Sequence, residues 1–251
     1  MTIAILSALP QEQHGLVELL EQPQPTVARA GRAFHRGRLS GHDVVLVLSR
    51  VGKVAAATTV TAAIEHFGAQ RVLFTGVAGG LAAEVKVGDV VVATEFLQHD
   101  LDSSPLFPRY EVPFYGLSRF TADATMSAAL LQAARELCAD AATHFDAALR
   151  DEFGLHAPGV HQGLVVSGDR FVSTSAESRA LTTALPDALA VEMEGAALAQ
   201  ACHDYGVPFA AVRTISDRAD DAAHVDFPRF IDRVASRHAK VLMLQTLRLL
   251  R

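Results

Sequence analysis

Short apolar runs alternate with longer segments of helical periodicity along most of this chain. The apolar runs, which predict strands, cover residues 3–7, 72–75, 90–94, 164–167, 189–191 and 209–213. Residues 34–39 and 44–48 flank Gly41-His42-Asp43, which predicts a hairpin. Helical patterns cover residues 11–20, 52–67, about 121–151 and 227–249. Buried strands that alternate with helices predict an α/β fold, with a mostly parallel central sheet covered on both faces.

Nothing along the chain suggests a domain boundary. We find no internal repeat, low-complexity tract or linker, so we predict a single domain over residues 1–251. Residues 76–80 (GVAGG) predict a glycine-rich turn after a strand, and residues 98–118 predict a long loop. Ligands of such folds bind beyond the carboxyl ends of the parallel strands. The residues that follow each apolar run are therefore the candidates for a site.

Glu192 and Glu194 follow the apolar run at residues 189–191 and bracket Met193. In an extended segment, residues two apart point to the same side, so both carboxylates could face one ligand. A ribose with vicinal hydroxyls is a suitable partner, because buried carboxylates need hydrogen-bond donors. The alternative is two solvated charges at a helix N-terminus, where the helix dipole favours carboxylates.

Composition excludes several other classes of function. The net charge of −6 argues against nucleic acid or an anionic membrane as the main partner. No run of 18 apolar residues predicts a transmembrane helix, and no signal-like segment precedes the first strand. Cys138 and Cys202 lack metal-type spacing, and we predict no metal and no cofactor. We therefore expect a cytoplasmic protein that acts on a small molecule.

Seven short motifs taken together are more specific than any one of them. They are residues 4–12 (AILSALPQE), 49–53 (SRVGK), 74–80 (FTGVAGG), 87–91 (VGDVV), 167–172 (SGDRFV), 191–194 (VEME) and 212–217 (VRTISD). In this order and spacing, they resemble the purine nucleoside phosphorylase/uridine phosphorylase superfamily, and within it the methylthioadenosine/S-adenosylhomocysteine nucleosidases. The resemblance extends over residues 1–235. It implies a three-layer α/β sandwich and hydrolysis of the N-glycosidic bond of 5′-modified adenine nucleosides.

The resemblance also implies catalytic roles. Glu12 matches the residue that activates the attacking water, and Asp217 matches the residue that protonates purine N7, with Ser216 orienting it. Arg213 matches an arginine near the water and Glu12. The chemistry agrees, because glycoside cleavage needs carboxylates near a cationic sugar and a proton for the leaving group. The alternatives are a helix N-cap for Asp217 and a solvated carboxylate for Glu12.

Substrate-binding roles follow from the same resemblance. Glu194 and the backbone of Met193 match the groups that hold the ribose hydroxyls, with Glu192 beside them. Phe171 matches the ring that stacks on adenine, and the backbone of Val172 matches the contact with the base edge. For Phe171 the alternative is a core residue. For Glu192, structural support of a neighbouring loop is as good an interpretation as a ribose contact.

The expected 5′ pocket is apolar. Leu9, Val51 and Phe227 match the residues around the 5′-thioalkyl group. Val77 departs from the family, because the nucleosidases usually have serine there. The missing hydroxyl removes one possible hydrogen bond, worth about 1 kcal/mol.

The resemblance also implies a homodimer in which a neighbouring subunit closes the pocket. We expect the apolar residues of the long loop to lie at that interface; they are Leu106, Phe107, Val112 and Phe114. His99, Asp100 and Asp102 in the same loop allow a metal site or a dyad, but solvated loop charges are the simpler interpretation.

Three other functions remain open at this stage. A phosphorylase would need groups that bind a phosphate dianion, yet Thr75 stands where phosphorylases have arginine, and Glu12 would repel the anion. A non-catalytic nucleoside-binding protein would have no need of Glu12 and Asp217. Hydrolysis of a larger, futalosine-type nucleoside is compatible with the sequence.

Overall fold

A computed structural model describes residues 1–250 of the chain. Within them, one mixed sheet contains β1 (Thr2–Ser7), β2 (Val27–Arg29), β3 (Arg32–Leu39), β4 (His42–Leu48), β5 (Ala69–Gly80), β6 (Val90–Gln98), β7 (Arg119–Thr121), β8 (Val160–Ser167), β9 (Ala188–Glu192) and β10 (Phe209–Asp217). The predicted hairpin is confirmed as β3 and β4, which pair antiparallel.

The pairing path of the sheet closes on itself. The order is β10-β6-β8-β9-β5-β1-β4-β3-β2, and β10 also pairs with β5. The longest parallel ladders join β5 to β10 and β6 to β8, whereas β10 pairs antiparallel with β6. The carboxyl ends of β5, β9 and β10 therefore come together, and this is where the candidate residues lie.

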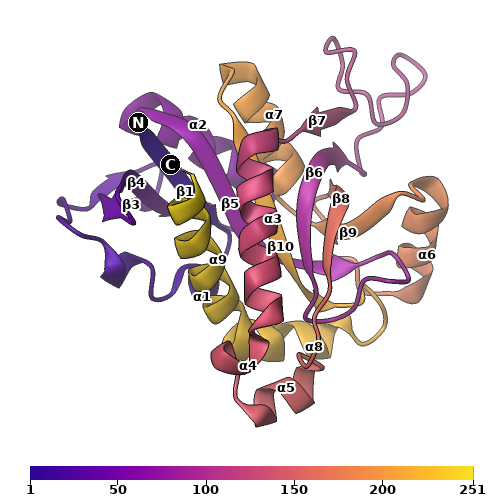
Figure 1. The fold of residues 1–251 in the computed structure, drawn as a ribbon. Coiled ribbons are helices and arrows are strands. Elements are labelled where there is room, and N and C mark those ends of the chain that lie inside the picture. Colours follow the sequence, from indigo (N-terminus) through magenta and orange to yellow (C-terminus); the bar gives the residue numbers. More distant parts are fainter. Residues whose placement is uncertain (251) are drawn as a thin grey trace.

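Helices cover both faces of the sheet (Figure 1). They are α1 (Pro10–Gln13), α2 (Lys53–Phe67), α3 (Ala124–Ala139), α4 (Ala141–His144), α5 (Ala147–Phe153), α6 (Ser175–Ala184), α7 (Gly195–Tyr205), α8 (Ala223–Phe230) and α9 (Ser236–Leu249). Helices α3 and α9 pack together on one face, and α2 packs against α7 on the other. The predicted three-layer α/β sandwich is confirmed.

Alternation along β1 divides the hydrophobic core into two layers. Ile3 and Ile5 belong to the cluster that includes α3 and α9, whereas Ala4 and Leu6 belong to the cluster that includes α2 and α7. All four residues are buried. Because successive side chains of a strand point to opposite faces, a continuous apolar run is the pattern expected of a strand covered on both sides.

Two predicted segments differ from the structure. The helix predicted at 11–20 ends at Gln13, because Gly15 has a positive φ of 80° and a short 3₁₀ turn, Val17–Leu19, follows. The turn predicted at 76–80 is wrong, because these residues continue β5 to Gly80. Their backbone pairs with β10 and, at Gly79 and Gly80, with β9.

The helical patterns predicted at about 121–151 form the three helices α3, α4 and α5. Asp123 caps α3 by accepting a 2.8 Å hydrogen bond from the backbone N–H of Met126. Asp146 caps α5 by accepting one of 2.9 Å from Leu149. The C-terminal helix begins at Ala223, earlier than predicted, and a π-helical turn at Ile231–Ala235 joins α8 to α9. No helix within residues 1–250 has the length and apolar character needed to cross a membrane.

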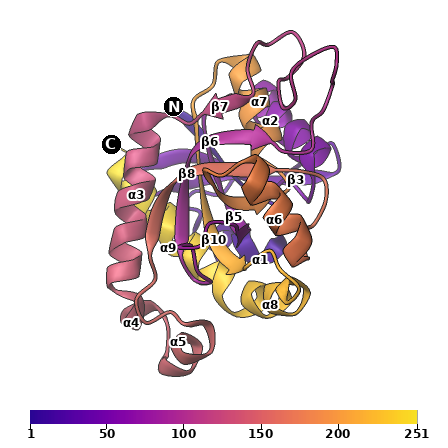
Figure 2. The ribbon, with the colours of Figure 1, turned by 90° about the vertical axis from the view of Figure 1, so that its right-hand side faces the viewer.

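Of the loop predicted at 98–118, Gln98 still belongs to β6, and residues 99–118 contain no helix or strand. It links β6 to β7 and projects from the body of the molecule in both views (Figure 2). Leu106 and Phe114 are 84% and 93% exposed, whereas Val112 is buried. The rings of Phe107 and Phe114 pack edge to face, with their centroids 5.1 Å apart.

Candidate active site

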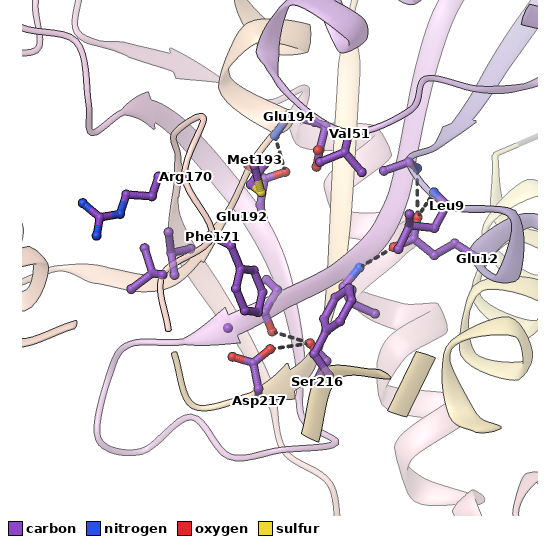
Figure 3. Close-up of a pocket in the computed structure, with 17 residues that line it drawn as sticks. Leu9, Glu12, Val51, Arg170, Phe171, Glu192, Met193, Glu194, Ser216 and Asp217 are labelled. Carbon is purple, nitrogen blue, oxygen red and sulfur yellow. Dashed lines mark hydrogen bonds between the residues drawn. The ribbon is translucent and has the colours of Figure 1, made fainter. Parts of the chain in front are cut away.

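One cavity collects almost every residue that the sequence singled out (Figure 3). It lies where β5, β9 and β10 end. The predicted residues that line it are Leu9, Glu12, Val51, Val77, Phe171, Val172, Glu192, Met193, Glu194, Ser216, Asp217 and Phe227. Arg213 is the exception, because it is buried and does not line the cavity. Residues as distant in sequence as Leu9 and Phe227 thus share one site.

Glu12 is buried, and its carboxylate is held by backbone donors. Oε2 accepts hydrogen bonds of 2.8 Å from the N–H groups of Ala8 and Leu9, and Oε1 accepts one of 3.1 Å from Val77. Burial raises the pKa of Glu12, although these hydrogen bonds and the charge of Arg213 oppose the shift. A buried carboxylate with a raised pKa is suited to general base catalysis. This position does not fit the solvated alternative.

Asp217 lies at the end of β10 and is buried. Its Oδ1 accepts a 2.8 Å hydrogen bond from the backbone N–H of Ala219, and its Oδ2 accepts one of 2.8 Å from the Ser216 hydroxyl. Burial raises the pKa of Asp217, and the charges of Asp220 and Asp226 add to the shift. A carboxyl group with a raised pKa can donate a proton near neutral pH.

Two glycines of β5 make room for these two carboxyl groups. A Cβ at Gly76 would lie 3.1 Å from Glu12 Oε1, and a Cβ at Gly79 would lie 2.9 Å from Asp217 Oδ1. The glycines therefore allow the carboxylates to approach the strand closely. The glycine-rich motif therefore does mark the site. Its glycines are needed because the two carboxyl groups lie close to the strand, and not because the chain turns there.

Glu194 faces the cavity from the N-terminus of α7. Its Oε1 accepts a 2.7 Å hydrogen bond from the backbone N–H of Gly52, which ties the residues before α2 to the site. Burial raises the pKa of Glu194 to about 8, and the charge of Glu192 adds to the shift. The remaining oxygen is free of protein donors within residues 1–250, so a ligand hydroxyl could donate to it.

Glu192 is held by its own surroundings. Its carboxylate accepts hydrogen bonds from the backbone N–H groups of Glu194 and Gly195, and from the Ser167 hydroxyl. It also forms a 2.9 Å ion pair with Arg213. Because so many donors already occupy it, this arrangement favours the structural interpretation of Glu192 over a direct ribose contact.

Arg213 is buried beneath the site. Its guanidinium lies 4.0 Å from the centroid of the Phe74 ring and pairs with Glu192, not Glu12. Its charge nevertheless lowers the pKa values of both Glu12 and Glu194, against the effect of burial. The structure thus places Arg213 as a positioning and electrostatic residue, and its predicted part in catalysis stays a prediction.

The part of the cavity around Phe171, which is expected to hold the adenine, is aromatic and open to solvent. Phe171 is 41% exposed and packs edge to face on Phe227, with ring centroids 5.5 Å apart. Such exposure does not fit a core residue and leaves a ring face for stacking. Val172 is buried beside it. Leu9 and Val51 line the opposite part of the cavity (Figure 3).

Asp100 helps to fix the loop before α2. It accepts a 2.6 Å hydrogen bond from Lys53 Nζ and one of 2.9 Å from the backbone N–H of Asp169. Asp169 in turn accepts a 2.7 Å hydrogen bond from the backbone N–H of Lys53. Asp100 is therefore an ordered link between three segments, which differs from the solvated charge that we expected.

Five residues of the cavity lining were not predicted as site residues. They are Ala8, Ala78, Gly79, Arg170 and Val191. Each lies within two positions of a predicted site residue, so motif context was the available signal. Arg170 is exposed, and its guanidinium points away from the carboxylates in Figure 3.

Comparisons with known proteins agree with this geometry. Residues 2–248 match the family described as the phosphorylase superfamily. The chain is 37% identical to the 5′-methylthioadenosine/S-adenosylhomocysteine nucleosidase of Anoxybacillus flavithermus, over 97% of each chain. It is 33% identical to the nucleosidase of Shewanella halifaxensis, over 99% of each.

Solved structures place the chain in the same family. The nucleosidase from S. pneumoniae, solved with the transition-state inhibitor MT-ImmA, is 33% identical with a TM-score of 0.86, over all of both chains. Futalosine hydrolase of Helicobacter pylori is 31% identical with a TM-score of 0.83, over 98% of this chain and 97% of that one. The chain therefore belongs to the phosphorylase superfamily, and within it to the 5′-methylthioadenosine/S-adenosylhomocysteine nucleosidases.

Proposed function

We propose that this protein hydrolyses the N-glycosidic bond of 5′-modified adenine nucleosides, releasing adenine and a 5′-substituted ribose. The substrates would be methylthioadenosine, S-adenosylhomocysteine and 5′-deoxyadenosine. The observation that supports this most strongly is the arrangement of Glu12, Glu194 and Asp217. These three buried carboxyl groups come from three separate segments and line one cavity.

The three groups divide the work of glycoside cleavage. Asp217, with its raised pKa, donates a proton to the departing adenine. Glu194 accepts hydrogen bonds from the ribose hydroxyls, because its second oxygen has no donor among the described residues. Glu12 accepts a proton from the water that attacks the anomeric carbon. Phe171 stacks on the adenine, and the Val172 backbone contacts its edge.

Water fits the site better than phosphate as the nucleophile. A phosphate dianion needs arginines or several unoccupied backbone N–H donors. Among the described residues of the cavity lining, Arg170 is the one arginine, and it is exposed. The N–H groups of Ala8, Leu9 and Val77 already donate to Glu12. A dianion at this place would meet the carboxylate of Glu12.

The test is an assay of the purified protein in phosphate-free buffer and again with millimolar phosphate. We expect equal rates of adenine release from methylthioadenosine and a free sugar as the second product. A requirement for phosphate, together with a sugar 1-phosphate product, would instead identify a phosphorylase. Inosine is the control substrate, since the proposed site is specific for adenine.

The apolar part of the cavity supports a preference for thioether substrates. Leu9 and Val51 line one part of the cavity, and Phe227, which packs on Phe171, lines the same cavity. Burying a methylthio group contributes about 1–2 kcal/mol, or about tenfold in kcat/KM over adenosine. Equal efficiency on adenosine and methylthioadenosine would show that this part of the cavity does not hold the 5′ group.

We also propose that the enzyme is a cytoplasmic homodimer. Leu106 and Phe114 expose large apolar groups on the loop between β6 and β7, and such groups favour an interface. In a two-fold dimer, this loop would contribute the same apolar surface to the interface from both subunits. Cys138 and Cys202 are both free thiols, which is consistent with a reducing compartment.

A further inference from the structure

Helix α2 begins against the active site, and the residue before it has no side chain that could cap it. That residue is Gly52, whose φ of 99° is a conformation that favours glycine. The first N–H groups of a helix find no acceptor within the helix and need one from elsewhere. Here, two carboxylates from distant segments accept them. Glu194 accepts a 2.7 Å hydrogen bond from Gly52, and Asp169 accepts one of 2.7 Å from Lys53.

The hydrogen bond from Gly52 gives the start of α2 a direct effect on Glu194. A helix N-terminus carries partial positive charge, which favours a carboxylate beside it. Burial and the charge of Glu192 raise the pKa of Glu194, and the hydrogen bond from Gly52 opposes the shift. The same bond fixes Oε1 of Glu194. The direction of the second oxygen, which we propose to meet the ribose hydroxyls, therefore depends on where Gly52 lies.

The side chain of Lys53 ties the start of α2 to the end of β6. Its Nζ donates hydrogen bonds of 2.6 Å to Asp100 Oδ1 and 3.1 Å to Gln98 Oε1. Gln98 Nε2 in turn donates one of 2.7 Å to Gln200 of α7. The Lys53 side chain is only 17% exposed, whereas lysine usually keeps its ammonium group in water. This ammonium group is therefore held by protein acceptors.

Asp100 completes a ring of hydrogen bonds between separate segments. Its Oδ2 accepts a 2.9 Å hydrogen bond from the backbone N–H of Asp169, whose own carboxylate accepts from the backbone of Lys53. Burial alone would raise the pKa of Asp100, but the hydrogen bonds from Lys53 and Asp169 lower it by more. Asp100 is therefore ionised at neutral pH. The ring places the start of α2, and with it Gly52, relative to Glu194.

We propose that Lys53 and Asp100 are positioning residues that act on the ribose through Gly52 and Glu194. Neither is among the described residues that line the nucleoside cavity, so their effect has to be transmitted. The inference rests on the proposed function, because it takes Glu194 to bind the ribose hydroxyls. An ion pair outside the cavity thus sets how strongly the enzyme distinguishes a ribose from a deoxyribose.

The test measures kcat/KM for methylthioadenosine and for its 2′-deoxy and 3′-deoxy counterparts. The ratio of the ribose value to each deoxyribose value reports the contact with one hydroxyl. Asp100 also contacts the segment that leads to Phe171, but an effect on adenine binding is common to the three substrates and cancels in the ratios. The intrinsic lability of each glycosidic bond cancels when a variant is compared with the wild type.

Asp100→Ala removes both acceptors, and Lys53→Met removes the ammonium group. Both side chains are partly exposed, so the variants should fold, which thermal unfolding checks. We expect each variant to lower at least one of the two ratios by about tenfold, within the range that small displacements cost. Asp100→Asn keeps one acceptor and should restore part of the lost ratio.

The control is Asp187→Ala. It removes an ion pair of 2.7 Å with Arg119, just before β9 and away from the carboxyl end where the site lies. Both ratios should stay at their wild-type values in this variant. If turnover of any variant is too slow to measure, dissociation constants of the 7-deaza counterparts of the three substrates give the same ratios, since these have no N7 to protonate.

The two proposals fail in different ways. Unchanged ratios in Asp100→Ala and Lys53→Met, including equal losses of rate on the three substrates, would overturn the positioning role and leave the proposed function intact. Such equal losses would indicate a general structural role. Failure of the wild-type protein to release adenine from methylthioadenosine would overturn the proposed function itself.

Discussion

The Ser216 hydroxyl donates a 2.8 Å hydrogen bond to Oδ2 of Asp217, the next residue in β10. The backbone N–H of Ala219 donates to the other oxygen, so both oxygens of the carboxylate are fixed. These bonds lower the pKa of Asp217, but burial raises it by more. The side chain is therefore both oriented and able to hold a proton, the two properties that a general acid requires.

Asp217→Asn should nearly abolish adenine release from methylthioadenosine, because asparagine cannot supply the proton. A loss of about 10²–10⁴-fold in kcat is expected for removal of a general acid. The loss should be much smaller with a riboside whose leaving group needs no proton. Rates measured on both substrates check this, and equal losses would indicate a structural role. Ser216→Ala is the matched control, with a smaller loss.

Glu12→Gln should remove the general base while keeping the volume of the side chain. Turnover should fall by several orders of magnitude, whereas the binding of a substrate analogue should persist. Three backbone N–H groups donate to this carboxylate, so some loss of stability is also expected. Thermal unfolding, analogue binding and kcat separate these effects. Turnover near that of the wild type by a folded variant would contradict the assignment.

Glu194 should make a contribution to the stability of the unliganded protein that is lost as pH rises from about 4.5 to about 8. Glu194 has its pKa raised to about 8, from a reference value of 4.5. Between these values the folded protein binds more protons than the unfolded chain, so rising pH favours unfolding. Tm measured across this range should fall less steeply in Glu194→Gln. Glu18→Gln, at an exposed position, is the control and should keep the wild-type slope.

Gly76→Ala should lower activity more than stability. The added Cβ would lie 3.1 Å from Glu12 Oε1 and displace the carboxylate by a few tenths of an ångström. Small displacements of a catalytic group cost up to about 10²-fold in rate. Gly68→Ala is the opposite control, because Gly68 has a φ of 65° and no neighbour within 4 Å. It should cost about 1 kcal/mol of stability and leave kcat unchanged. Similar kinetics for the two variants would contradict this explanation.

Replacing both Leu106 and Phe114 with serine should yield a monomer of reduced activity. These side chains are 84% and 93% exposed, so the change should not affect folding. Light scattering at micromolar concentration measures the oligomeric state, and adenine release measures the activity. The control is Leu249→Ser, at an exposed position of α9. A wild-type protein that is monomeric and fully active would contradict the proposed dimer.

Local pattern was sufficient for most of the fold. The apolar runs became β1, β5, β6, β8, β9 and β10, and the hairpin formed around Gly41. The pattern of apolar and polar residues gave the wrong secondary structure where pairing with a strand distant in sequence determines it. Residues 76–80 contain three glycines and read as a turn, yet β9 and β10 hold them in a strand. No local signal reports on partners more than a hundred residues away.

The site shows the same limit. The motifs were sufficient to predict which residues line the site, since residues from Leu9 to Phe227 do lie around one cavity. The partner of Arg213 was not predictable in this way. Its ion pair is with Glu192 and not with Glu12, because β9 and β10 bring the first pair within 2.9 Å.

The closed pairing path of the sheet bears on how the protein behaves at high concentration. Strand edges with free N–H and C=O groups are the usual templates for aggregation. Among the described strands, only β2 and β7 pair with a single neighbour, and each is three residues long. Such short edges offer little length for strand addition by another molecule. The connectivity that assembles the active site thus also protects the chain from edge-to-edge association.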